Sequence, residues 1–277
     1  GIGHGWVKRL FIDRSYRRGE IPEDYRFIPA LVYDNEALMR NDPEYIKRLE
    51  ALPESLRAAW LYGSWDVFSG QFFPEFDETL HVCEPFPLPR DAAYYCAVDY
   101  GLDMLAALFI AVGSDGRAYV YDEVYESDLI VSAAAAKIRG KLPESAVVIA
   151  PADLWSRGRD SGRSAAELFA ENGVYFTRIV PDRVDGWLAL KEWLAAPNGA
   201  PRLMIFRGCR NLIRCLPQLL HDAHRPGDAA TEPHEITHAP DALRYFASFR
   251  GAAAREERGL LRGRGSFQKG ERKRYGV

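Results

Sequence analysis

The chain has 277 residues, of which 47% are hydrophobic and 27% are charged, and its net charge is -3. These values are ordinary for one large or two small globular domains and exclude a largely disordered chain. Apolar stretches such as residues 146–150 are far shorter than the roughly 20 residues that a membrane helix requires, and the first residues lack a secretory signal pattern. We therefore expect a cytosolic protein that is not secreted and has no membrane partner.

The positions of the cysteines and histidines in the sequence are only weak evidence for a metal site. The chain has four cysteines without a C-x-x-C pair, Cys83, Cys96, Cys209 and Cys215. This pattern predicts buried reduced thiols and neither a zinc ribbon nor a disulfide framework. His234 and His238 are four residues apart, a spacing that could suit a metal on one helix face, but Pro233 and Pro240 make a continuous helix across both doubtful.

Charge is distributed unevenly along the chain. Residues 251–277 contain eight Arg and Lys against three Glu, so this end carries +5 and the preceding residues carry -8. Because almost no aliphatic residue follows Leu261, we expect a flexible basic tail. It could follow DNA phosphates or simply keep the chain in solution.

The first 80 residues show no hydrophobic pattern that predicts a β-sheet. In order they read as a charged loop at 14–24, a short β-like piece at 25–31, a helix at 43–52, a helix at 54–62 that ends at Gly63, and an aromatic-rich segment at 65–76. This pattern indicates a connecting element without an independent core.

From residue 91 onward the pattern predicts strands and then alternating helices. We expect strands at 94–99, 105–112, 118–124, 146–150, 174–180 and 202–206, and helices at 129–141, 164–171, 184–195, 209–220 and 237–249. A hairpin turn at 113–116 joins the second and third strands. Three antiparallel strands followed by parallel βα units predict an α/β fold, a mixed sheet with helices on both faces.

The last predicted helix begins with recognisable signals. Thr237 can cap it, and Pro240 is tolerated in the first turn because its missing N–H would lack a partner there anyway. Asp241 therefore lies near a helix start, where the helix dipole favours an ionised carboxylate.

Two further acids follow β-prone segments. Asp99 ends the first strand just before the turn at Tyr100 and Gly101, and Asp153 lies just beyond the strand at 146–150. A strand gains nothing from burying an aspartate unless a cation, a partner or water accompanies it. Asp99 is therefore a candidate metal ligand, although it could instead only begin the turn.

Together the three acids suggest one chemistry. If the first and fourth strands are parallel neighbours, Asp99 and Asp153 project from the same edge and Asp241 can reach them. Carboxylates without obvious basic partners repel one another, and divalent cations remove that cost. Two Mg²⁺ or Mn²⁺ ions about 4 Å apart, with Asp99 shared between them, would suit phosphodiester cleavage. Spacing alone is weak support, because the chain has 39 acidic residues.

A wider resemblance strengthens this interpretation. The phrase DYG (99–101), Asp153 and the phrase HAPDALRY (238–245) together resemble the nuclease domain of tailed-phage terminase large subunits, which has an RNase H-like fold. The segments GIGHGWVKRLF (1–11), RFIPA (26–30), NDPEY (41–45), GSWD (63–66) and GQFFP (70–74) resemble the region that joins the ATPase of that family to its nuclease. The resemblance implies a connector at 1–85, a nuclease domain at 86–250 and a tail at 251–277.

The resemblance also implies roles for single residues. It matches the catalytic, metal-binding acids of the family to Asp99, Asp153 and Asp241. Some members use a histidine one turn before the last acid, here His238, but many have an acid before it where this chain has Thr237. His238 could therefore ligate a metal, orient Asp241 or only pack.

The roles of several other residues near these acids remain open. Asp103 could hold a metal-bound water or be a solvated turn acid, and Glu123 is expected to face solvent or arginine partners. Arg157, Arg159 and Arg163 could contact DNA phosphates, or they could be surface arginines without that role.

The function implied is a metal-dependent endonuclease that cuts concatemeric double-stranded viral DNA during genome packaging. Implied partners are the portal protein, the small terminase subunit and an ATPase domain of the same full-length protein, in the host cytoplasm and transiently at the procapsid portal. No G-x-x-x-x-G-K-[ST] phosphate loop occurs, so we expect a fragment that carries the nuclease end and cannot translocate DNA by itself. The alternatives are a junction resolvase or transposase-like nuclease of the same fold, or a non-catalytic module that docks on DNA or the portal.

Overall fold

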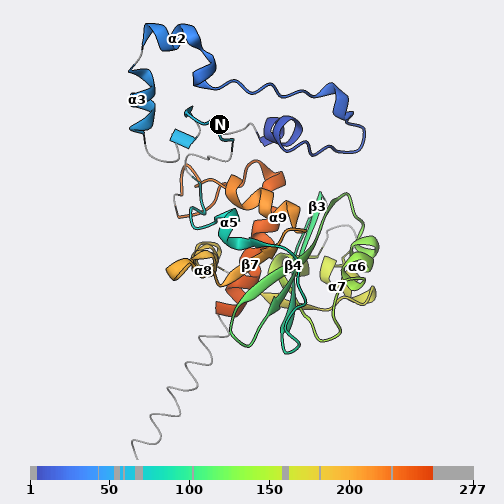
Figure 1. Ribbon diagram of the computed structural model, residues 1–277. Helices are drawn as coiled ribbons and strands as arrows, with labels where there is room; N and C mark the ends of the chain where they lie inside the picture. The colour runs from blue at the N-terminus through green and yellow to red at the C-terminus, as the bar shows by residue number, and fades with distance from the viewer. Residues whose placement is uncertain are drawn as a thin grey trace, which may run out of the picture. The chain divides into compact units, whose positions relative to one another are not determined.

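The computed structural model describes residues 5–251, except for residues 43, 53–56, 59, 66–70, 102, 158–161, 181 and 226 (Figure 1). The chain forms two compact units: Gly1–Pro74 with Pro217–Pro233, and Glu75–Leu216 with His234–Val277. The basic tail expected from residue 251 lies outside the described residues from 252 onward, as do residues 54–56 and 59 of the helix expected at 54–62. Each unit is considered by itself.

The first unit consists of short helices and long connections. Its described helices include α1 (Gly5–Val7), which continues as a π-helical turn at Lys8–Ile12, α2 (Glu36–Asn41) and α3 (Tyr45–Glu50). The helix expected at 43–52 is confirmed as α3, whereas the strand expected at 25–31 is wrong, since these residues are extended but pair with no described strand. β-prone side chains form a strand only where a neighbour accepts their backbone hydrogen bonds.

The second unit is built on a seven-stranded sheet in the order β1-β7-β4-β3-β2-β5-β6. The strands are β1 (Val82–Cys83), β2 (Ala93–Tyr100), β3 (Met104–Val112), β4 (Ala118–Ser127), β5 (Val147–Pro151), β6 (Phe176–Ile179) and β7 (Leu203–Phe206). All six expected strands of this region are therefore present. The two-residue β1 was not predicted, because a segment that short has no periodic pattern.

Strand directions explain how the acids can share an edge. β2 pairs antiparallel with β3, which pairs antiparallel with β4. On its other side β2 pairs parallel with β5, with Ala97 opposite Ile149, and β5 pairs parallel with β6. The α/β fold class with three antiparallel strands and then parallel βα units is confirmed, and so is the adjacency of the first and fourth predicted strands.

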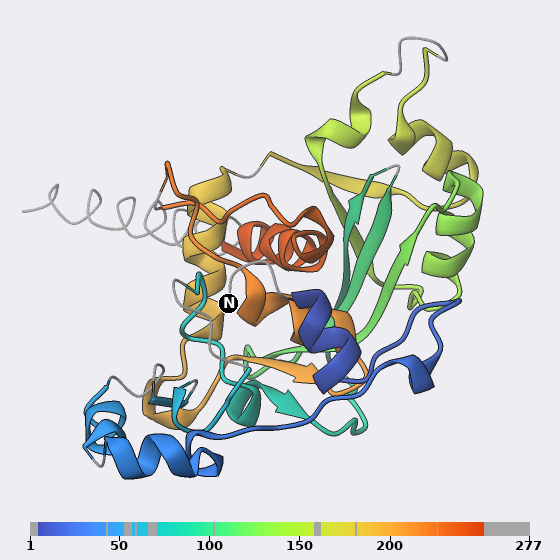
Figure 2. The same ribbon diagram turned by 90° about the horizontal axis from the view of Figure 1, so that it is seen from above.

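Helices cover both faces of the sheet. The helices α6 (Val131–Arg139) and α7 (Ala165–Glu171) lie on one face, and α8 (Arg183–Leu194) and the helix at 238–251 lie on the other (Figures 1 and 2). Side chains alternate along β2 accordingly. Cys96 and Val98 pack in the core beneath α6 and α7, whereas Tyr95 contacts Phe246 of the 238–251 helix with ring centroids 5.5 Å apart.

Local signals fix most helix starts and one early end. Ser164 forms the capping box that starts α7, its hydroxyl accepting from the N–H of Glu167 while the Glu167 carboxylate accepts from the N–H of Ser164. The helix expected at 209–220 is shorter than predicted: α9 spans Arg210–Cys215 and a 3₁₀ turn follows at Leu216–Gln218. Pro217 explains this end, because it supplies no N–H to an α-helix.

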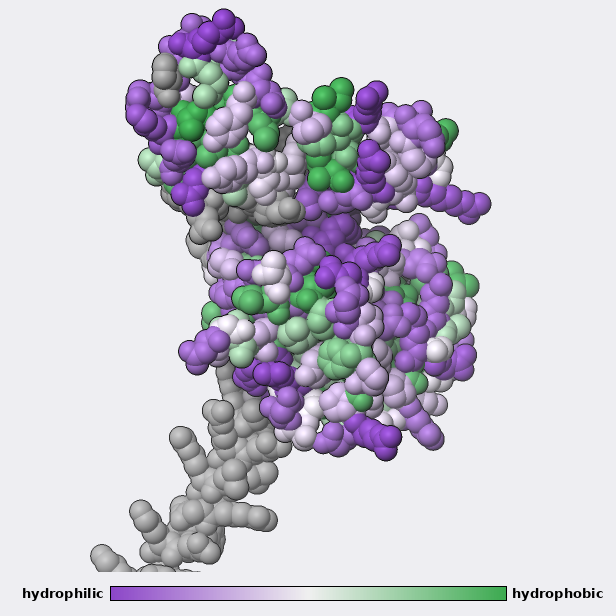
Figure 3. Space-filling model, viewed as in Figure 1, coloured by the Kyte–Doolittle hydropathy of each residue, from purple (hydrophilic) through white to green (hydrophobic). Residues whose placement is uncertain are grey.

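The helix expected at 237–249 is present at 238–251, although Thr237 does not act as predicted. Its hydroxyl donates to the carbonyl of His234 at 2.9 Å, within the preceding 3₁₀ turn His234–Ile236. This bond ties the turn to the start of the helix. On the face seen in Figure 3, hydrophobic residues form small separate groups among polar ones. None of the described helices is long and apolar enough to cross a membrane.

Candidate active site

Asp99 is the penultimate residue of β2 and lies opposite Ala106 of β3. The alternation that points Tyr95 toward the 238–251 helix also points Asp99 there, four residues further along the strand. The first strand therefore delivers a carboxylate to the face that this helix covers.

Two side chains of the helix hold Asp99. The Nδ1 of His238 donates to Oδ2 of Asp99 at 2.8 Å, and the hydroxyl of Tyr245 donates to Oδ1 at 3.1 Å. His238 and Tyr245 are two helical turns apart and so lie on one face of the helix. A carboxylate offers about four acceptor positions. Asp99 therefore keeps room for a cation after both bonds are made.

His238 is buried, with a side chain 6% exposed, and its electrostatics reflect competing causes. Burial lowers its pKa, but the hydrogen bond and charge of Asp99, with the charges of Asp103 and Asp241, raise the pKa above its ordinary value overall. Its second ring nitrogen, Nε2, is buried and makes no hydrogen bond within the described part of the chain. Of the three roles open for His238, the structure contains a direct bond to Asp99 and not to Asp241.

Asp241 is buried and, contrary to the expectation of acids without basic partners, lies between two arginines. Oδ1 of Asp241 accepts from Nε of Arg244 at 2.8 Å and lies 2.7 Å from its Nη2, while Nη1 of Arg183 donates to it at 3.2 Å. Burial raises the pKa of Asp241, and although both arginines lower it, the pKa remains above its ordinary value. The sequence did not reveal these partners, since Arg183 is distant along the chain.

Close helix packing places Arg244 there. A Cβ at Gly186 of α8 would lie 2.7 Å from Ser248 Oγ and 2.9 Å from Arg244 Cγ, so only glycine permits this approach of the two helices. The guanidinium of Arg244 then lies 4.9 Å from the ring centroid of Trp187 and 4.7 Å from that of Tyr245. Aromatic rings thus hold the buried cation that faces Asp241.

Asp153 lies in a 3₁₀ turn (Ala152–Trp155) that follows β5 directly. Because β5 runs parallel to β2 as its neighbour, the end of β2, which contains Asp99, and the end of β5, which Asp153 follows, lie at the same edge of the sheet. Asp153 is exposed, and among the described residues its carboxylate has no hydrogen-bond partner. The joint role of the three acids stays a prediction.

Asp103, in the turn from β2 to β3, lies close to two histidines. Its Oδ2 accepts from Nδ1 of His234 at 2.9 Å and lies 3.5 Å from Nε2 of His238. The ring centroids of the two histidines are 4.4 Å apart, although His234 belongs to the 3₁₀ turn and His238 begins the α-helix. The four-residue spacing was the only sequence signal for this pair, and nothing in the sequence linked it to Asp103.

The arginines that follow Asp153 have acidic partners. Arg157 lies 3.6 Å from Glu167, and Arg163 pairs with Glu171, both acids being on α7. Arg159 lies outside the described residues. Contact of these arginines with DNA therefore stays a prediction.

Glu123 differs from the sequence expectation. Instead of facing solvent or arginines, it accepts from the backbone N–H groups of Asn211 and Leu212, at 2.8 and 3.0 Å, and so satisfies the first turn of α9. Burial raises the pKa of Glu123, and these bonds oppose that shift. No local pattern marks this long-range cap.

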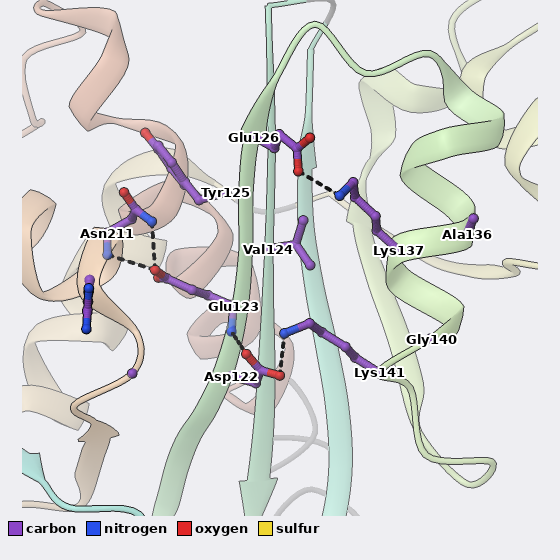
Figure 4. A pocket seen from close by; sticks show the side chains of 12 residues that line it. Asp122, Glu123, Val124, Tyr125, Glu126, Ala136, Lys137, Gly140, Lys141 and Asn211 are labelled. Carbon is purple, nitrogen blue, oxygen red and sulfur yellow. Dashed lines mark hydrogen bonds and ion pairs between the residues drawn. The ribbon is translucent and has the colours of Figure 1, made fainter. Parts of the chain in front are cut away.

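Glu123 lines a shallow groove between β4, the end of α6 and the start of α9 (Figure 4). Four of its other charged residues pair across it, since Lys141 lies 2.6 Å from Asp122 and Lys137 lies 2.8 Å from Glu126, and Arg210 also lines it. With Glu123 and Arg210 included, three acidic and three basic residues line the groove, so its formal charges balance.

The three acids offer ligands of the type that divalent metal ions prefer, but the group of ligand atoms that lies within 4.8 Å among the described residues is Asp103, His234 and His238, not these acids. Asp99, Asp153 and Asp241 supply carboxylate oxygens, which Mg²⁺ and Mn²⁺ prefer. The buried Nε2 of His238 without a hydrogen bond is a further donor of the kind that a metal satisfies. The chemistry of these side chains suits the ions that the sequence predicts, and the convergence of the three acids on those ions stays a prediction.

Comparison with known proteins supports the fold directly. The nuclease domain of the P22 large terminase matches with a TM-score of 0.53 and 18% identity, over 66% of this chain and 93% of that domain. The large terminase of a thermophilic bacteriophage matches with a TM-score of 0.52 and 18% identity, over 88% of this chain. The same thermophilic terminase in complex with ATP-gamma-S gives a TM-score of 0.51 at 18% identity.

This chain covers 60% of the length of the thermophilic large terminase. No protein-family model matches the chain, and no curated protein matches it by sequence. Sequence identities this low are informative about the fold alone. The three matched structures indicate the same fold. The chain therefore has the RNase H-like fold of large terminase nuclease domains.

Proposed function

We propose that this chain is the nuclease part of a phage terminase large subunit, a metal-dependent endonuclease that cuts concatemeric double-stranded viral DNA during genome packaging. The observation that carries the proposal is the parallel pairing of β2, which contains Asp99 near its end, with β5, which Asp153 follows, so that the two strands end at one edge. The 238–251 helix lies beside β2 and adds Asp241.

Asp99, Asp153 and Asp241 would hold two Mg²⁺ or Mn²⁺ ions, which when bound supply an activated water and stabilise the leaving oxygen. The protein's own groups orient this set. His238 and Tyr245 fix the carboxylate of Asp99. Arg244 and Arg183 keep Asp241 in place before a cation arrives, by neutralising a carboxylate that is otherwise costly to bury.

The remaining partners follow from the same proposal. DNA is the substrate, and an ATPase domain, the portal protein and the small terminase subunit would act on the same complex, in the host cytoplasm and at the procapsid. The thermophilic large terminase, of which this chain covers 60%, has been solved with ATP-gamma-S, which supports a nucleotide-binding partner domain.

Plasmid nicking in the presence of Mn²⁺ tests the proposal. Asp153→Asn should reduce the nicking rate at least about 100-fold, equivalent to about 2.7 kcal/mol of activation free energy, because it removes charge from the metal-binding set. Asp115→Asn is the matched control, since Asp115 is an exposed acid in the turn between β3 and β4, at the other end of the sheet. Equal rates for wild type and Asp153→Asn would contradict the assigned site.

Two results would favour the alternative functions. Faster cutting of branched than of linear DNA would favour a junction resolvase of the same fold. DNA binding without nicking by the unmodified chain, in either Mg²⁺ or Mn²⁺, would favour a docking module.

A further inference from the structure

We propose that Arg178, held over the ring of Trp155, binds a phosphate of the DNA backbone beside the carboxyl edge of the sheet. This contact rests on the proposed function, which makes DNA the substrate at this edge. Its support comes from the order of the strands, from the contact with the ring, and from the partners of the other arginines nearby.

Strand order places Arg178 next to the proposed active site. β6 pairs parallel with β5, with Arg178 opposite Ala150, so β6 ends at the same edge as β5 and β2. Neighbouring strands are about 4.8 Å apart, so β6 lies about 10 Å from β2 across β5. Along this edge Asp99 belongs to β2, Asp153 follows β5, and Arg178 belongs to the next strand.

An aromatic ring fixes the position of this cation. Cζ of Arg178 lies 5.7 Å from the ring centroid of Trp155, within the range of a cation–π contact. Trp155 ends the 3₁₀ turn that contains Asp153. It also packs against the core beneath α6 and α7 and meets Phe176 edge to face, with ring centroids 6.3 Å apart. Trp155 is therefore a positioning residue that holds the guanidinium beside the turn of Asp153.

The charge of Arg178 is not matched by an acid, unlike that of its neighbours. The arginines predicted to contact DNA, Arg157 and Arg163, pair with acids of α7, and Arg183 pairs with Asp241. Arg178 is exposed, and its guanidinium forms no ion pair or hydrogen bond with the part of the chain that the structure describes. Because a ring does not neutralise its formal charge, its N–H donors remain available to an anion.

A phosphodiester is the anion that fits this position. A guanidinium presents a planar fork of donors that matches phosphate oxygens, and stacking on a ring preorganises that fork. Contacts of this kind position a duplex without reading its sequence. A fixed cation at this edge also offsets part of the repulsion between DNA and the acids before metal ions bind. Arg178 would therefore strengthen DNA binding, with a smaller effect on the cleavage step.

Binding of a short fluorescein-labelled DNA duplex tests this contact. Anisotropy is measured in EDTA, which prevents cleavage, between about 50 and 200 mM salt. Arg178→Gln should lower the slope of log affinity against log salt by about 0.9 and weaken binding at least about threefold at 0.1 M salt. Arg202→Gln is the matched control and should keep the wild-type slope. Arg202 is also exposed, lies 4.6 Å from the ring centroid of Trp193, and precedes β7 at the opposite edge of the sheet.

Equal slopes for wild type and Arg178→Gln would overturn the contact. Arg178 would then be a charge that only keeps the edge strand β6 from pairing with other chains. An equal loss of slope in Arg202→Gln would also overturn it, by showing a general effect of net charge.

Variants of Trp155 test the positioning role. Trp155→Leu should weaken DNA binding in the wild-type background and add little in the Arg178→Gln background, whereas Trp155→Phe, which keeps a ring, should bind nearly as wild type. Additive losses in the double variant would overturn this role.

Nicking in Mn²⁺ is measured separately and distinguishes this inference from the proposed function. Wild type that nicks DNA while Arg178→Gln keeps the wild-type slope would overturn the contact alone. Wild type that binds DNA with the expected slope difference but does not nick it would support the contact and contradict the nuclease.

Discussion

The carboxyl edge of the sheet and the groove beside β4 carry similar residue types but bury them differently. At the edge, Asp241, Arg244 and His238 are nearly inaccessible to water and bond one another or Asp99. In the groove, Lys137, Lys141 and their acidic partners have side chains 40% to 46% exposed. Water screens the charges in the groove. At the edge, buried side chains of the protein surround and bond the charged groups.

The difference indicates where chemistry is concentrated. Exposed pairs cost little to make and contribute little, so a groove of such pairs is explained by solvation alone. Buried charges are expensive, and they persist where the surrounding structure compensates them, as the rings beside Arg244 do. Shifted pKa values in such a place are a physical sign of a functional site.

The largest expected effect is at Arg244. Arg244→Met keeps an apolar stem but leaves Asp241 with Arg183 alone, whose side chain is 33% exposed. We expect a loss of about 3 kcal/mol or more in the free energy of unfolding, measured by urea denaturation. Lys141→Met in the groove is the control, expected to change the same quantity by less than about 1 kcal/mol. Similar losses of stability for both variants would contradict the difference between the buried charges of the edge and the exposed charges of the groove.

Helix approach at Gly186 gives the next effect. Gly186→Ala places a methyl group 2.7 Å from Ser248 Oγ and 2.9 Å from Arg244 Cγ. Helix propensity favours alanine by up to about 1 kcal/mol, and overpacking costs about 1 to 3 kcal/mol, so we expect a net loss near 1 kcal/mol. Gly208→Ala should cost less, because a Cβ there meets nothing within 4 Å. A stabilised Gly186→Ala protein would show that the contact relaxes freely.

Protonation of His238 should appear in the pH dependence of stability without metal. Its pKa is raised in the folded state, so its contribution is complete below about pH 6.5 and is lost as pH rises through the folded pKa. In EDTA, the free energy of unfolding should therefore fall above pH 6.5, by about 1.4 kcal/mol for each tenfold by which folding strengthens proton binding. His238→Gln should flatten this fall, and His224→Gln should not. Parallel curves for wild type and His238→Gln would contradict the assigned environment.

The smallest effect belongs to the groove. A double-mutant cycle on Lys137 and Glu126, both to Ala, should give a coupling energy of about 0.2 to 1 kcal/mol, decreasing with added salt. The cycle uses urea denaturation at two salt concentrations. A larger, salt-insensitive coupling would mean that water does not screen the charges of the groove.

Periodic features of the sequence predicted most of the fold. Six strands and the helices between them follow from alternation and helical spacing, and Ser164 marked a helix start. Local patterns failed where a distant partner decides the outcome. Residues 25–31 lack a described strand to pair with, and Glu123 turns toward α9, 88 residues further along the chain.

The candidate site divides in the same way. Asp99, Asp153 and Asp241 were predicted as ligands from local features, because each lies at or just after a strand end or near a helix start, and their joint role stays a prediction. The arginines on Asp241 and the cluster of Asp103 with His234 were missed. These contacts depend on close packing at Gly186 and on the fold of a turn at Gly101, and neither can be read from spacing.

The bonds of Asp99 to His238 and Tyr245 have a consequence for assigning roles by mutation. Asp99 is a tether as well as a candidate ligand, because the only described bonds from the 238–251 helix to β2 at this edge end on its two oxygens. Removing it would leave a buried imidazole and a buried hydroxyl without partners, and would loosen the helix that carries Asp241. An inactive Asp99 variant could thus have lost either a metal ligand or the docking of the 238–251 helix. Asp153 is exposed and bonds no helix, so its variants report on the chemistry alone.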